Sequence, residues 1–206
     1  MDRSLRGVAA AGGTTVYKGD PGEDSRVYKS RNGVGKNANV AKDRENQRAD
    51  RACGFYHHFM ISVSISNPYE QTLNFPVLKD AARAVLAGEG IANAKVTLAF
   101  VNDPHIHRLN KQFLEHDEPT DVLTFPYSDK GSKKIEGDVV ISYETAAEYA
   151  ADRDHSLELE LLLYVVHGCL HLCGYDDTSA KAEKIMRKKE REYLSKLGLP
   201  DIANRT

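Results

Sequence analysis

Residues 156–177 read SLELELLLYVVHGCLHLCGYDD, a long apolar segment that ends in a cluster of histidine and aspartate. Ser156 is a favourable helix N-cap, and the glutamates after it suit the positive end of a helix dipole. Apolar side chains occupy nearly every side of a helix from Leu157 to Leu172, and Gly174 is a natural C-terminal stop. A helix that is apolar all round belongs inside a core. The segment therefore predicts a central, buried helix.

The end of this predicted helix carries a metal-ligand pattern. His167 and His171 are four residues apart, so both imidazoles lie on one helical face and can reach one metal ion. Gly174 turns the chain back, and Asp177 can then supply a carboxylate. Two histidines and an aspartate with one open position are typical of a catalytic site, and nitrogen and oxygen donors favour zinc. The sequence predicts Zn²⁺ bound by His167, His171 and Asp177.

Neighbouring side chains offer rival ligands. Cys169 and Cys173 lie in the same segment, but Cys169 points to another face of the helix. We expect both cysteines to be small buried hydrophobic groups rather than ligands. Asp176 is the neighbouring alternative to Asp177.

The same spacing invites comparison with zinc proteases of the pattern H-E-x-x-H-x-x-G-x-x-H. Their general base is the glutamate that follows the first histidine. Gly168 occupies that position and has no side chain to move a proton. Peptide hydrolysis by that mechanism is therefore not expected.

Shorter patterns before and after the buried segment predict an α+β fold. Four stretches alternate in polarity or are apolar between turn residues, as strands do, and four others have helical spacing. The expected strands are 61–67, 95–101, 121–125 and 137–142, and the expected helices are 75–86, 103–113, 144–151 and 178–197. Asp103 is the expected cap of the second of these helices, with Pro104 at its first position. We expect a small mixed sheet of about four strands packed with helices around the central one.

The composition of the chain changes at Met60. Residues 1–59 hold 11 Lys and Arg against 7 Asp and Glu, and 8 of the 15 glycines, whereas residues 60–206 hold 17 Lys and Arg against 23 Asp and Glu. The first segment lacks the periodic apolar residues that a core requires. We expect residues 1–59 to be a disordered basic extension or a misassigned translation start, and 60–206 to be the functional domain.

Composition also bears on location. No stretch reaches the roughly 20 apolar residues of a membrane helix, and the N-terminus shows no secretory leader. The chain has three cysteines, which is too few for a disulfide framework. These features predict a cytoplasmic protein that does not bind a membrane.

Three motifs, in order along the chain, resemble the YbeY-type endoribonucleases, also called rRNA maturation factors. Residues 167–176 read HGCLHLCGYD and follow the signature H-G-x-L-H-L-x-G-Y-D-H, residues 118–126 read EPTDVLTFP, and residues 137–142 read GDVVIS. The resemblance extends from about residue 60 to about residue 200. It implies a zinc-dependent endoribonuclease specific for single strands, active in 3′-end maturation of small-subunit ribosomal RNA and in ribosome quality control. Ribosomal RNA and the ribosome or its proteins are the implied partners.

The resemblance leaves the chemistry partly open. A metal ion can polarise a phosphoryl oxygen and lower the pKa of its bound water toward about 7, which makes that water the proposed nucleophile. The RNA 2′-hydroxyl is an alternative, and no side chain is identified as a general base. A second hypothesis is a ribosome-associated assembly factor whose zinc is structural and whose free-standing nuclease activity is weak.

Two departures from the family pattern affect the predicted site. Asp177 stands where the family has a third histidine, and Leu114 stands where it usually has an arginine suited to phosphate. Lys111, one helical turn before Leu114, is a hypothetical substitute. Thr120 and Asp121 are interpreted as turn and strand-start residues.

Other polar residues are interpreted as surface or loop residues without a role in the site. Four histidines are expected at the surface or in loops: His105, His107, His116 and His155. The last predicted helix holds a group of cations interleaved with glutamates: Lys181, Lys184, Arg187, Lys188, Lys189 and Arg191. We interpret this group as a solvated helix face, although local cationic patches would help an acidic body to bind RNA.

Overall fold

The computed structural model describes residues 60–129 and 131–203. Within these ranges the chain forms five helices and one sheet of four strands, which confirms the predicted α+β class. The strands are β1 (Met60–Ser66), β2 (Asn93–Val101), β3 (Val122–Pro126) and β4 (Lys134–Ser142). The helices are α2 (Phe75–Gly88), α3 (Asp103–Leu114), α4 (Tyr143–Asp152), α5 (Leu157–Leu172) and α6 (Ala180–Lys196). The prediction for residues 1–59 lies outside the described residues.

The sheet is mixed, in the order β1-β2-β4-β3. β1, β2 and β4 run parallel, and β3 pairs antiparallel with β4. β2 and β4 begin earlier than predicted because Asn93 pairs with Lys134 at the start of their shared ladder. Lys95 also faces Glu136 across the two strands, with 3.2 Å between Nζ and Oε1. The sequence pattern misses these first residues because the buried Ala94 and Ile135 lie between exposed polar residues, so neither start forms an apolar run.

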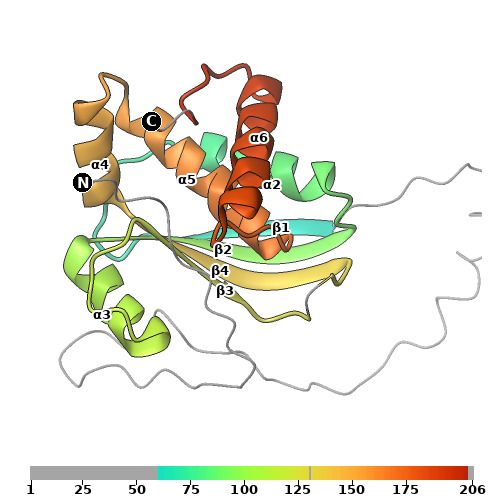
Figure 1. Cartoon of the computed structure of the whole chain (residues 1–206), viewed down its shortest axis with the longest axis horizontal. Coiled ribbons are helices and arrows are strands. Elements are labelled where there is room, and N and C mark those ends of the chain that lie inside the picture. Colours follow the sequence, from blue (N-terminus) through green and yellow to red (C-terminus); the bar gives the residue numbers. More distant parts are fainter. Residues whose placement is uncertain (1–59, 130, 204–206) are drawn as a thin grey trace, which may run out of the picture. The chain divides into compact units, whose positions relative to one another are not determined.

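Helices cover the two faces of the sheet unequally (Figure 1). α2, α5 and α6 lie over one face, whereas α3 lies at the other. On the α3 side, Phe113 packs edge-on against Phe125 of β3 with ring centroids 5.5 Å apart. Every residue of α5 from Glu160 to Leu172 is buried, so the predicted central helix is confirmed.

Helix caps fix where α3, α4 and α5 begin. Ser156 caps α5 as predicted, because its Oγ accepts a hydrogen bond from Leu159 N. The prediction for α3 is wrong by one residue: Asn102 is the N-cap, and its side chain accepts from His105 N. The Asp103 carboxylate instead accepts hydrogen bonds from the hydroxyls of Ser142 and Thr145 at the start of α4. Asp103 therefore ties two helices together.

Among the described residues, none of the helices is both long enough and apolar enough to cross a membrane.

Candidate metal centre

The chain reverses direction directly after α5. Gly174 adopts a φ of +95°, which favours glycine, and its N–H donates to His171 O. Tyr175 N then donates to Leu170 O at 3.1 Å. Together these bonds form a Schellman motif, which satisfies the last carbonyl groups of the helix. The reversal brings residues 175–177 back beside the histidines.

The two predicted histidines face each other at this end of α5. The Nε2 atoms of His167 and His171 are 2.9 Å apart. Both rings are almost fully buried, with side-chain exposures of 2% and 1%. Two nitrogens held by one zinc ion at about 2 Å in a tetrahedron lie about 3.3 Å apart, so this separation fits shared ligation.

Hydrogen bonds at the far side of each ring set which nitrogen is free. Nδ1 of His171 is 3.0 Å from Tyr175 O, and a carbonyl oxygen can only accept, so Nδ1 carries the proton. Burial, together with the neighbouring His167, lowers the pKa of His171 to about 3. His171 is therefore neutral at pH 7 and turns the Nε2 lone pair toward His167. This is the protonation state that metal binding requires.

Asp177 completes the predicted trio. Its Oδ2 is 3.7 Å from His167 Nε2, and its Oδ1 is 3.7 Å from His171 Nε2. The carboxylate is 5% exposed, and burial raises its pKa. One donor atom from each of the three residues lies within 4.8 Å of the others. Two imidazoles and a buried carboxylate that converge in this way are suited to a divalent cation.

Glu190 is part of the centre and was missed by the sequence analysis. It lies on α6 and is fully buried. Its Oε1 forms a hydrogen bond with His167 Nδ1 at 2.7 Å. Burial raises the pKa of this carboxyl group, but the hydrogen bond from His167 and the charge of Arg187 lower it to about 2. The ionised carboxylate accepts a hydrogen bond from His167 Nδ1–H, which leaves the Nε2 lone pair of His167 directed at the site. A carboxylate behind a histidine is a usual support for metal ligation.

A second carboxylate anchors the loop that carries Asp177. Glu89, at the C-terminal end of α2, accepts hydrogen bonds from Tyr175 Oη at 2.8 Å, Tyr193 Oη at 2.7 Å and Lys189 Nζ at 2.9 Å. Tyr175 supplies the carbonyl that holds His171, and the other two donors flank Glu190 on α6. Glu89 therefore links the loop and the helix that orient the two imidazoles.

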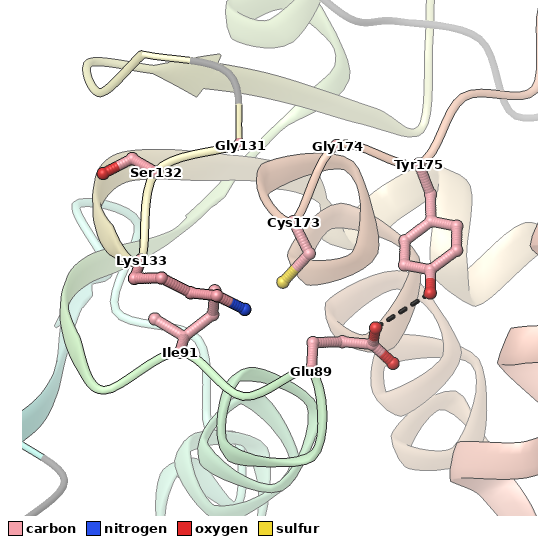
Figure 2. Close-up of a pocket in the computed structure, with 8 residues that line it drawn as sticks. All are labelled: Glu89, Ile91, Gly131, Ser132, Lys133, Cys173, Gly174 and Tyr175. Carbon is pink, nitrogen blue, oxygen red and sulfur yellow. Dashed lines mark hydrogen bonds between the residues drawn. The ribbon is translucent and has the colours of Figure 1, made fainter.

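The rival cysteines lie away from the three donors. Cys169 is completely buried. Cys173 points into a pocket of about 200 Å³ beside Lys133, Glu89 and Tyr175 (Figure 2). Burial and the nearby Glu89 raise the pKa of the Cys173 thiol to about 12, so it is not a ready thiolate ligand. Asp176 also turns away, since its carboxylate accepts from Thr178.

Asp121, Lys111 and Leu114 lie away from the three donors. Asp121 is buried, and its Oδ1 accepts from Val122 N at 2.9 Å at the start of β3. Lys111, the hypothetical phosphate ligand, lies 2.6 Å from Asp117 Oδ2 and is exposed. Leu114 is the last residue of α3.

The four other histidines of the described residues lie outside the donor group. His105 contacts Tyr69, and His107 contacts Asp117. His155 lies in the loop between α4 and α5, as predicted, and its side chain is only 10% exposed because it contacts the buried Glu160 at 2.7 Å.

Comparison with known proteins agrees with the three motifs. The family model for the endoribonuclease YbeY matches residues 64–198. The chain belongs to the YbeY family. It is 45% identical over 130 residues to the endoribonuclease YbeY of Pelotomaculum thermopropionicum, which covers 60% of this chain and 86% of the relative. The YbeY protein of Carboxydothermus hydrogenoformans is 42% identical over 123 residues, covering 60% of this chain and 85% of that protein.

A protein from Thermotoga maritima with a solution structure is also similar. It is 27% identical, with a TM-score of 0.47, and the match covers 70% of this chain and 100% of that one. The resemblance to YbeY proteins predicted from the sequence is thus confirmed by the family match, whereas zinc binding by His167, His171 and Asp177 stays a prediction.

Proposed function

We propose that this YbeY-family chain is a zinc-dependent endoribonuclease that cleaves single-stranded RNA. The observation that carries the proposal is the convergence of His167, His171 and Asp177 at the buried end of α5. The names of its relatives support the reaction type. Within the same proposal, its role is 3′-end maturation of small-subunit ribosomal RNA and ribosome quality control in the cytoplasm.

Each side chain of the centre has a distinct task in this proposal. His167 and His171 bind zinc through Nε2, and Asp177 supplies an oxygen ligand. Glu190 and the carbonyl of Tyr175 hold the rings through Nδ1, which fixes their tautomers and directions. A zinc ion would polarise a phosphoryl oxygen and acidify a water molecule. The negative charge of Asp177 makes that water less acidic than three neutral histidines would.

A second candidate is a ribosome-associated assembly factor whose zinc is structural. The pairing of Lys111 with Asp117 favours it, because Leu114 replaces the family's usual arginine and no free cation takes its place on α3 among the described residues. The two candidates differ in what loss of zinc does to the fold.

Removal of zinc is expected to abolish RNA cleavage without unfolding the domain. The core that surrounds α5 is apolar and does not depend on the three ligands. Treatment with a chelator should therefore give a folded, inactive protein, and one equivalent of zinc should restore activity. Circular dichroism and cleavage of a single-stranded RNA, measured on the same samples, test this. Unfolding on chelation would instead support the assembly factor, and cleavage that persists without metal would refute zinc dependence.

Glu190→Gln is expected to weaken zinc binding by about 10–100-fold, because an amide holds the His167 Nδ1 proton less well than a carboxylate does. Competition with a chelating dye measures the dissociation constant. Glu183→Gln is the matched control, since Glu183 lies on the same helix, also pairs with Arg187 at 3.7 Å, and does not touch a histidine. Equal zinc affinity in the two variants would show that Glu190 does not position His167.

A further inference from the structure

The cations of the described domain are concentrated on one helix. α6 carries seven of the 17 Lys and Arg residues of residues 60–206, in a segment that has an excess of acidic residues overall. An RNA-binding protein gains most of its affinity by neutralising phosphates, so an acidic body must gather its phosphate contacts locally. The arrangement of the α6 cations therefore matters more than the net charge.

These seven cations form two groups. Four are held by carboxylates: Arg187 by Glu183 and Glu190, Lys189 by Glu89 and Glu192, Arg191 by Asp201, and Lys196 by Glu192. The remaining three, Lys181, Lys184 and Lys188, are exposed, and no carboxylate of the described residues pairs with them. We call these three the α6 stripe.

Helical spacing puts the α6 stripe on one outward face. Its members are three and four residues apart, so they follow each other along the surface over about 10 Å at 1.5 Å per residue. The opposite face of α6 holds Met186, Glu190 and Tyr193, all buried. Ile185 lies within the stripe and is 47% exposed, which adds an apolar surface among the ammonium groups.

The α6 stripe begins close to the candidate metal centre along the chain. Lys181 follows Asp177 by four residues, a span of at most about 14 Å. α6 itself supplies Glu190 to the centre. Glu190 reaches the centre from the face opposite the stripe, so a strand with one phosphate at the metal centre would pass over the first turn of α6, at Lys181, to reach the stripe.

We propose that the α6 stripe is a docking surface for the phosphodiester backbone of single-stranded RNA, beside the centre that cleaves it. The inference rests on the proposed nuclease function for its substrate class. The stripe matches an RNA backbone because its three ammonium groups follow one another along the helix, while the neighbouring Glu183 and Glu192 are paired with other cations. Lysines bind phosphates as point charges, without reading sequence, which suits a surface that holds a strand in place.

The test compares salt dependence of binding. Replacing three phosphate contacts to a single strand should make the slope of log K against log salt shallower by about 2. The triple variant Lys181→Gln, Lys184→Gln, Lys188→Gln should show this loss and weaker binding at low salt. The probe is a single-stranded RNA oligonucleotide whose 2′-O-methyl phosphorothioate backbone resists cleavage, bound to the zinc-loaded full chain.

A matched control removes the same charge elsewhere. Lys79→Gln, Arg83→Gln, Lys95→Gln takes three positive charges from α2 and β2, and should keep the parent slope. The proposal is overturned if the stripe variant keeps the parent slope, or if the control loses as much as the stripe variant does. An unchanged slope in the stripe variant would mean that the α6 stripe is a solvated face or contacts a protein instead of RNA. A parent that binds the probe with the expected slope but does not cleave ordinary RNA would refute the proposed function and leave the docking surface intact.

Discussion

His171→Ala is expected to reduce cleavage of single-stranded RNA by about a thousandfold or more, since a bound metal contributes several kcal/mol to transition-state stabilisation. His171 offers Nε2 at 2.9 Å from that of His167, so its loss removes one of three converging donors. Purified parent and variant, prepared identically, should differ in cleavage and in bound zinc. Circular dichroism should find both folded, because the apolar contacts of α5 remain.

His116→Ala is the control for this experiment. His116 is exposed, lies between α3 and β3, and is not part of the donor group. The control should cleave as the parent does. Equal cleavage by the parent and His171→Ala would indicate a contaminating nuclease, and absence of cleavage in the parent would favour the ribosome-bound assembly factor.

The convergence of His167, His171 and Asp177 follows from local sequence, whereas the contacts that orient them do not. His167 and His171 are related by helical spacing, and Gly174 indicates the turn that returns Asp177, so local geometry is sufficient to bring the three together. Glu190 is 23 residues from His167 on another helix, and only the packing of α6 on α5 joins them. No local sequence pattern predicts the packing of α6 on α5.

A signal for Glu190 nevertheless exists in the sequence. It occupies the same helical face as Met186, Tyr193 and Leu194, which are buried. A carboxylate on an apolar face is rarely buried without a partner. The cations of α6 dominate its composition, and they predict a solvated, charged helix when its faces are not considered separately. The inward face of α6 carries the buried Glu190, and the outward face carries the α6 stripe.

The difference between local sequence and tertiary contacts also explains why the first residue of α3 was predicted wrongly. Asn102 and Asp103 are both favourable caps, and local sequence does not rank them. Tertiary contacts decide, because the hydroxyls of Ser142 and Thr145 engage Asp103 and leave Asn102 to cap α3. The periodicity of the sequence thus predicts that α3 forms, whereas the residue at which α3 begins depends on contacts with α4.

Gly168 lacks the side chain of a general base, and it also makes a close contact with the sheet that its sequence position does not reveal. A Cβ atom built at Gly168 would lie 2.3 Å from Val139 Cγ1 of β4 and 3.4 Å from Val122 Cγ1 of β3. Both valines are buried and β-branched, so their methyl groups have little freedom to move. The absent side chain allows α5 to approach the sheet beside His167. A glutamate at position 168, as in the zinc proteases, would not fit this interface.

Gly168→Ala is expected to lower the free energy of unfolding by about 2 kcal/mol, even though alanine is the better helix former. Overpacking a core contributes a loss of up to about 3 kcal/mol, and the helix propensity of alanine offsets about 1 kcal/mol of it. The midpoint of thermal unfolding should fall by about 4–8 °C for a domain of this size. Zinc affinity should fall as well, because α5 must shift where it carries His167.

A second substitution separates this contact from a general loss of stability. Val139→Ala removes the Cγ1 methyl group that the new Cβ would meet, so the double variant should lose less than the two single variants combined, by about 1 kcal/mol or more. Urea unfolding of the four proteins in the cycle measures this coupling. Strict additivity would mean that the close approach of Gly168 to Val139 does not limit the packing of α5. A positive coupling with recovered zinc affinity would connect the helix–sheet distance directly to the position of His167.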